Sequence, residues 1–157
     1  MRHTTAFSLA LAAVLAASSA DAQSSACSSI RDSDQREYCR GTTGSPSACS
    51  SIRDSDLRER CRAAASGSSG PCSSIRDSDQ REYCRATNGS PSACSSIRDS
   101  DLREQCRAAT GNRSACSSIR DSDQREFCRG TTGSPSACSS IRDSDLRERC
   151  RAAASRR

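Results

Sequence analysis

Twelve cysteines set the strongest limit on how this chain of 157 residues can fold, because they occur as six evenly spaced pairs. The first cysteines of successive pairs are 22 or 23 residues apart, and the second cysteine of each pair follows the first by twelve positions. The shared pattern is C-S-S-I-R-D-S-D-x-R-E-x-C-R. Self-similarity of this regularity indicates a modular repeat. We therefore divide the chain into six tandem units of about 22 residues: 27–40, 49–62, 72–85, 94–107, 116–129 and 138–151.

The two variable positions of the pattern alternate from one unit to the next. Units one, three and five carry Gln followed by an aromatic residue, as in Gln35 and Tyr38. Units two, four and six carry Leu followed by a polar residue, as in Leu57 and Arg60. The connecting segments alternate in the same way. This second period predicts three pairs of about 44 residues, in which the aromatic ring of one unit packs against the Leu and Ile of its partner.

The first 22 residues have the pattern of a secretory signal peptide. A basic start at Arg2 precedes an apolar run too short to span a bilayer stably, and the run ends in Ala20-Asp21-Ala22. We expect cleavage after Ala22. The region 23–157, which carries the six units, is then expected in the periplasm or outside the cell, with no stable membrane span after cleavage.

The composition of that region indicates that disulfides hold the fold together. All twelve cysteines lie there, and an even count in an exported chain favours a disulfide framework. Ile, Leu and Phe make up only 10 of its 135 residues, a share below the roughly 20% typical of folded chains. At roughly 1.5–3 kcal/mol for each large buried side chain, so few cannot offset a backbone entropy cost of roughly 1–2 kcal/mol per residue.

Each unit also carries the signals of a short helix. Asp32 is a good N-cap, and Gln35 completes a capping-box pattern in the odd units. Asp32 with Arg36, and Glu37 with Arg40, have the spacing of ion pairs on a helix. We expect helix over residues 33–40 and over its copies. The expected N-caps are Asp32, Asp54, Asp77, Asp99, Asp121 and Asp143.

The helix is not expected to run through the whole unit. An unbroken helix would place Asp34 on the apolar face between Ile30 and Tyr38. A break at Arg31–Asp32 removes this conflict and lets the first part of the unit fold back onto the helix. We therefore predict an all-α fold, a small cystine-rich array of tandem, short, disulfide-stapled helical hairpins.

The hairpin also decides which cysteines can meet. In one continuous helix, Cys27 and Cys39 would lie about 18 Å apart along the axis, whereas a disulfide allows roughly 6 Å between Cα atoms. The hairpin brings them opposite one another and favours pairing within each unit. An alternative joins Cys39 to Cys49 across the connector. The cysteines expected in within-unit disulfides are Cys27 with Cys39, Cys49 with Cys61, Cys72 with Cys84, Cys94 with Cys106, Cys116 with Cys128, and Cys138 with Cys150.

Several functional classes find little support in the sequence. Structural zinc sites favour cysteines two to four residues apart, whereas these gaps are wide and the single His lies in the leader. The run "DSDQRE" lacks the glycine of a calcium loop. Nucleophilic catalysis lacks a His or Lys after the leader. Because three acids balance three Arg in the shared pattern, the net charge of +5 is scattered and does not favour nucleic-acid binding.

The pattern C-x-x-I-x-D-x-D-x-R-x-x-C, repeated after a signal peptide, resembles that of small exported bacterial proteins with one to several such units. The resemblance covers residues 27–151. It implies export and a bacterial host, and it implies no activity.

The expected function is that of an exported, non-catalytic scaffold for structure or interaction. Its partner would be a protein or a component of the cell envelope, and no cofactor is expected. Two alternatives remain open. One is a thiolate metal-binding protein, suggested by the abundance of cysteine. The other is a secreted toxin or antimicrobial protein, suggested by cystine density and a slight positive charge.

The disulfide framework can be tested by mass. If all twelve cysteines are paired, intact mass spectrometry without reductant should show the exported protein lighter by twelve hydrogens than the same protein after reduction. Alkylation before reduction should add no label. A mass that matches free thiols would contradict the framework.

Overall fold

A computed structural model describes residues 26–155, and over this range the chain forms helices and no strands. The all-α prediction is confirmed; the expected signal peptide, 1–22, lies outside the described residues. The α-helices are α2 (Ser33–Thr43), α3 (Ser55–Ser66), α4 (Ser78–Thr87), α5 (Ser100–Ala109), α6 (Ser122–Thr132) and α7 (Ser144–Ala154). The 3₁₀-helices are η1 (Pro46–Ser51), η2 (Gly70–Ser74), η3 (Pro91–Ser96), η4 (Arg113–Ser118) and η5 (Pro135–Ser140).

Each unit is a small hairpin made of a short helical piece, a break and an α-helix. In the first unit, residues 26–28 form the short piece and Ile30 and Arg31 are not helical. The break is held from inside the unit, because the guanidinium of Arg36 donates to the carbonyl of Ile30 over 2.9 Å. The helix then continues to Thr43, three residues beyond the predicted end.

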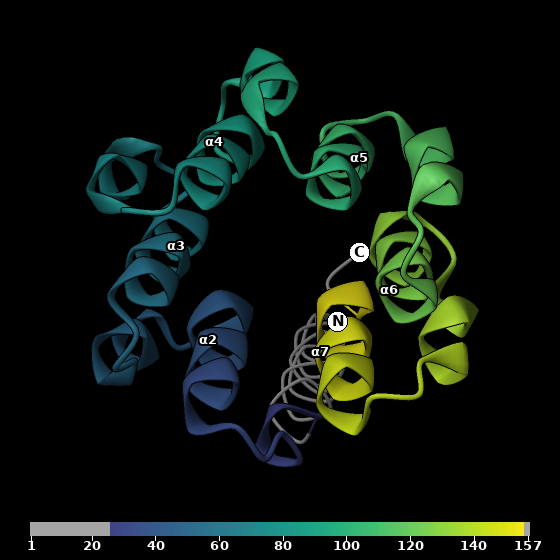
Figure 1. Ribbon diagram of the computed structural model, residues 1–157. Coiled ribbons are helices and arrows are strands. Elements are labelled where there is room, and N and C mark those ends of the chain that lie inside the picture. The colour runs from purple at the N-terminus through teal and green to yellow at the C-terminus, as the bar shows by residue number, and fades with distance from the viewer. Residues whose placement is uncertain (1–25, 156–157) are drawn as a thin grey trace, which may run out of the picture.

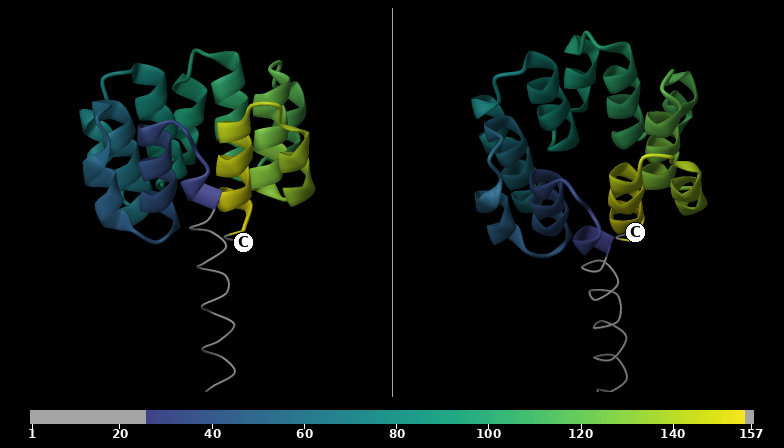
Figure 2. Two further views of the ribbon diagram at one scale, coloured as in Figure 1. Left: turned by 90° about the horizontal axis from the view of Figure 1, so that it is seen from below. Right: turned by 60° about the horizontal axis from the view of Figure 1, so that its bottom comes forward.

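The six hairpins close into a ring, as Figure 1 shows. Helices α2 to α7 stand side by side around a common axis, and the 3₁₀-helices form an outer layer. Helix α7 returns to the neighbourhood of α2 (Figure 2) and contacts it. The sequence predicts hairpins in a row but does not predict this closure. Six joints that all turn in the same direction bring the last unit back to the first.

The core is divided among the units. The six Ile side chains are each 1% exposed, and each packs with the disulfide of its own unit. The residue two positions after the second cysteine of each unit is Ala or Gly, and it is buried. It packs against the next unit: Ala63, for instance, lies with Cys72, Ile75 and Cys84. The same contact closes the ring, because Ala152 lies with Cys27, Ile30 and Cys39.

The small side chain at this position is required by the disulfide that faces it. A Cβ added to Gly41 would lie 2.6 Å from the Cys49 sulfur and closer still to that of Cys61, which is nearer than carbon and sulfur can approach. The joint between units therefore consists of a helix with a small residue pressed against the next disulfide.

The paired organisation of the sequence also appears in the packing. Tyr38 packs against the cluster of Ile52, Leu57 and the second disulfide. Tyr83 packs in the same way on the fourth unit and Phe127 on the sixth. The predicted packing of an aromatic ring against the Leu and Ile of its partner unit is therefore confirmed.

The joint predicts a sharp difference between two neighbouring alanines of α3. Ala63 is fully buried against the next disulfide, whereas Ala64 is exposed. Ala63→Leu should lower the free energy of unfolding by about 1–3 kcal/mol, because the added carbons overpack a filled joint. Ala64→Leu, the matched control, should change it by less than about 0.5 kcal/mol. Urea unfolding of the oxidised proteins measures both values, and equal effects would contradict the joint described here.

Candidate functional site

The cysteines are paired within the units, as the hairpin argument favours, and the cross-connector alternative does not occur. The disulfides join Cys27–Cys39, Cys49–Cys61, Cys72–Cys84, Cys94–Cys106, Cys116–Cys128 and Cys138–Cys150. Their Cα atoms lie 5.5–5.6 Å apart. Every cysteine in the described part of the chain is thus oxidised. The sulfur atoms serve as staples rather than as nucleophiles or metal ligands in this state.

The six expected N-cap residues each cap a helix. The carboxylate of Asp32 accepts the backbone N–H of Gln35 at 2.8 Å. The bonds made by Asp54, Asp77, Asp99, Asp121 and Asp143 are 2.6–2.8 Å long. Each cap satisfies one of the free N–H groups at a helix start.

Two details of the helix prediction are wrong. The capping box would need the Gln35 side chain to accept from the backbone N–H of Asp32, but that N–H donates to the carboxylate of Asp145. The buried amide oxygen of Gln35 has no hydrogen-bond partner within residues 26–155. The predicted Asp32–Arg36 ion pair is also absent there, because Arg36 turns to the carbonyls of Ile30 and Arg31.

The second aspartate of each unit forms a bond that the sequence analysis missed. Asp34 accepts the backbone N–H groups of Arg53 and Asp54 in the next unit, at 3.2 and 2.9 Å. The same arrangement repeats around the ring at 2.8–3.3 Å. It also closes the ring, since Asp145 accepts from Arg31 and Asp32. We call Asp34, Asp56, Asp79, Asp101, Asp123 and Asp145 the joint aspartates.

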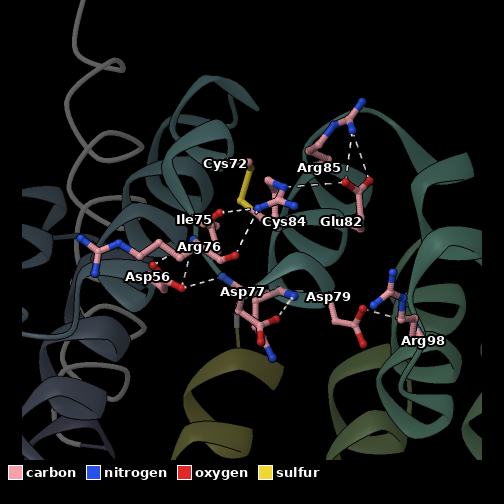
Figure 3. A network of polar contacts seen from close by, with 12 residues as sticks. Asp56, Cys72, Ile75, Arg76, Asp77, Asp79, Glu82, Cys84, Arg85 and Arg98 are labelled. Carbon is pink, nitrogen blue, oxygen red and sulfur yellow. Dashed lines mark hydrogen bonds and ion pairs between the residues drawn. A yellow bond between two sulfur atoms is a disulfide. The ribbon is translucent and has the colours of Figure 1, made fainter.

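Figure 3 shows one complete set of these contacts around the third unit. Asp56 reaches the backbone of Arg76 and Asp77 at the start of α4, and Asp77 caps that helix. Asp79, two residues further on in the first turn of α4, accepts the backbone N–H of Arg98 in the next unit. Each helix start therefore receives a carboxylate from the preceding unit and offers another to the unit that follows.

These bonds lower the pKa of all six joint aspartates below the ordinary value of 3.8. The largest cause is the backbone N–H of the next N-cap residue, such as that of Asp54 for Asp34. A hydrogen bond donated to the ionised form favours that form. The joints are thus made of charged acceptors on backbone donors, which are stronger than neutral hydrogen bonds.

The third carboxylate of each unit is also engaged. Glu37 pairs with Arg40 at 3.2 Å, and its five counterparts pair with the equivalent Arg at 2.8–3.2 Å. These Arg side chains are about half exposed, so each pair contributes little to stability. Over residues 26–155, every carboxylate therefore serves as a helix cap, a joint acceptor or an ion-pair partner. The same part of the chain holds no group of three or more His, Cys, Asp or Glu that could bind a metal ion.

The middle of the ring contains a chamber of about 330 Å³. Its walls include Tyr38, Tyr83 and Phe127 together with Arg60 and Arg149. All five occupy the second variable position of the repeat, just before the second cysteine. Residues from the last turns of the helices, such as Thr43 and Thr132, complete the wall.

The arginines of the chamber lie against its aromatic rings. The guanidinium carbon of Arg60 is 5.7 Å from the ring centres of both Tyr38 and Tyr83. That of Arg149 is 5.7 Å from the ring centre of Phe127. These are cation–π contacts. The sixth member of the set, Gln105, turns aside and donates to the side chain of Gln124 over 3.2 Å.

The alternation of aromatic and polar residues is the only sign of this chamber in the sequence. It correctly predicts the packing of each ring on the partner unit. It does not indicate that five of the six positions line one chamber, because this follows from ring closure. The joint aspartates left no distinctive sign either, since an acidic first turn is ordinary in a helix.

Comparison with family models, with curated proteins and with solved structures finds no match to this chain. No helix in the described range is long and apolar enough to cross a membrane.

The joint aspartates predict that acid weakens the ring. Their pKa values are lower in the folded protein than in the unfolded chain, so the unfolded chain binds more protons. Their contribution is complete above the unfolded value of about 4 and is lost as the pH falls through the lower folded values. Thermal unfolding followed by circular dichroism should show a level midpoint from pH 7 to about 5 and a falling one below about 4.

A variant with one joint neutralised supplies the control. Asp123→Asn should unfold at a lower temperature than the parent at pH 7, and it should lose less on acidification. A midpoint that rises between pH 5 and pH 3 in the parent protein would contradict the role of these carboxylates.

Proposed function

We propose that this protein is an exported, non-catalytic scaffold, a disulfide-stapled ring that presents a repeated polar surface to a partner in the periplasm or outside the cell. One observation carries the proposal: every described carboxylate caps a helix, joins two units or pairs with an Arg of its own unit. General acid–base and nucleophilic catalysis by carboxylates needs a group that is free to reach substrate. Here these groups build and join the units instead.

Export is supported by two independent features. The leader 1–22 has the pattern of a signal peptide. The described cysteines all form disulfides, which persist in oxidising compartments and are rare in the cytosol. The resemblance to small exported bacterial proteins adds a bacterial host to the proposal.

The surface of the ring suits a scaffold because each unit repeats the same polar groups. The Arg that precedes each N-cap is exposed in all six units, as Arg53 and Arg98 illustrate. Serines of the outer 3₁₀-helices, such as Ser50 and Ser96, are exposed as well. A partner that contacts several units at once gains affinity through multivalency without needing a strong contact at any one unit.

Fractionation tests export together with oxidation. The chain with its leader, expressed in a Gram-negative host, should appear outside the cytoplasm and resist labelling by a thiol-reactive polymer until it is reduced. The same chain without residues 2–22 should stay inside and take up label. Free thiols in the exported form would overturn the disulfide-stapled scaffold.

A photoreactive residue at the exposed position of Ser96 tests the scaffold itself in the native host. We expect a defined crosslinked product with the intact ring, and its loss when one staple is removed by Cys94→Ser with Cys106→Ser. An identical product from both proteins would contradict a role for the ring surface.

A further inference from the structure

The chamber contains two positive charges that the rest of the described chain does not balance. Each guanidinium in the Glu–Arg pairs of the units has a carboxylate nearby, but Arg60 and Arg149 make no ion pair and no side-chain hydrogen bond within residues 26–155. Every described carboxylate is engaged elsewhere, as caps, joints and ion pairs show. A charge taken partly out of water without an ion-pair partner is costly, so an anionic ligand would supply what these two arginines lack.

Both arginines of the chamber make cation–π contacts with its aromatic rings. The guanidinium of Arg60 lies over the rings of Tyr38 and Tyr83, and that of Arg149 lies over the ring of Phe127. Burial lowers the pKa of Arg149 below its ordinary value, and the nearby charge of Arg60 acts in the same direction. Both guanidiniums remain charged at neutral pH, because arginine does not lose its proton in proteins. The chamber therefore holds like charges close together.

The two arginines are the charged groups of the chamber, because its lining contains no carboxylate. Burial raises the pKa of Tyr83, which keeps its hydroxyl protonated. Two threonine hydroxyls of the wall donate to helix carbonyls: Thr43 to that of Cys39 at 2.7 Å, and Thr132 to that of Cys128 at 2.7 Å. A cationic ligand would meet two charges of its own sign. An anion would meet two forked donors and no carboxylate.

We propose that the central chamber binds a small aromatic carboxylate, whose charged group pairs with Arg60 and Arg149 and whose flat ring lies among Tyr38, Tyr83 and Phe127. This inference needs the closed, oxidised ring but does not depend on export or on a scaffold role. Guanidinium groups pair with carboxylates through parallel hydrogen bonds. The aromatic walls favour a flat apolar partner. The volume of about 330 Å³ is at the lower end of the roughly 300–1,000 Å³ typical of ligand pockets, which fits one or two fused rings.

The probe is 2-naphthoate, with 2-naphthamide as its neutral twin of nearly the same shape. Isothermal titration of the oxidised protein should show stoichiometric binding of naphthoate, and naphthamide should bind at least about tenfold more weakly, because it forfeits charge-assisted hydrogen bonds. Tyrosine fluorescence shows whether naphthoate binds in the chamber. Its only two tyrosines, Tyr38 and Tyr83, line the chamber, and it has no Trp. Naphthoate absorbs where tyrosine emits, so binding in the chamber should quench the tyrosine emission.

The sequence itself indicates which substitution the chamber arginines should tolerate. Gln105 occupies the position of Arg60 and Arg149 in the fourth unit, so this position accepts glutamine within the same fold. Arg60→Gln and Arg149→Gln should each weaken naphthoate binding by about tenfold or more while leaving naphthamide unchanged. Arg98→Gln removes the same charge from an exposed side chain and should bind naphthoate as the parent does.

Each outcome decides the proposal. Naphthoate binding with tyrosine quenching, weakened by the two chamber variants and not by Arg98→Gln, supports it. The proposal is overturned by no binding of naphthoate, by equal binding of naphthamide, or by full binding in both chamber variants. Where a variant does not fold, as judged by its thermal unfolding, the comparison of naphthoate with naphthamide on the parent protein decides alone.

Discussion

The disulfide inside each unit is the contact on which the rest of the structure depends. It closes a hairpin whose one fully buried large side chain is a single Ile, which could not hold the hairpin by itself. A staple across twelve residues contributes about 3 kcal/mol in the chain-entropy model. The same sulfur atoms form the surface on which the preceding helix rests, so Gly41 and Ala63 are small because a disulfide faces them. Removing one disulfide would therefore destabilise two units, the one whose hairpin it closes and the preceding one, whose helix packs against it.

Each carboxylate of the repeat has a structural role. In each unit one carboxylate caps the helix, one joins the next unit and one pairs with an Arg on the surface. This distribution explains how a chain poor in apolar residues can still form defined interfaces: the joints are made of ionised acceptors on backbone donors rather than of large side chains. Arg60 and Arg149 stand outside this pattern, and their guanidiniums lie over aromatic rings.

Much of the unit could be predicted from the sequence, because its determinants are local. The cap at Asp32, the break before it and the pairing of Cys27 with Cys39 all follow from residues within fourteen positions of one another. The packing of Tyr38 on the second unit could also be predicted from the alternation of the repeat. The ring could not, because closure depends on the angle at each joint, and an Asp in a first turn gives no sign that it will reach a neighbouring backbone. The capping box failed for the same reason: the backbone N–H of Asp32, which Gln35 would have bound, donates to the carboxylate of Asp145. The chamber could not be predicted either, because it forms only when the six units close into a ring.

Because its joints are nearly identical, a closed ring also restricts the number of repeat units in the chain. In an open array, gaining or losing a repeat changes only the length, and the remaining interfaces stay intact. Here the contacts of Asp145 and Ala152 with the first unit require the sixth unit to arrive at one place and one angle. Unequal recombination between near-identical repeats, which readily alters their number, would leave a chain of four or eight units with two unmatched ends. Selection for a closed molecule would then act on copy number itself, and would do so in steps of the two-unit block.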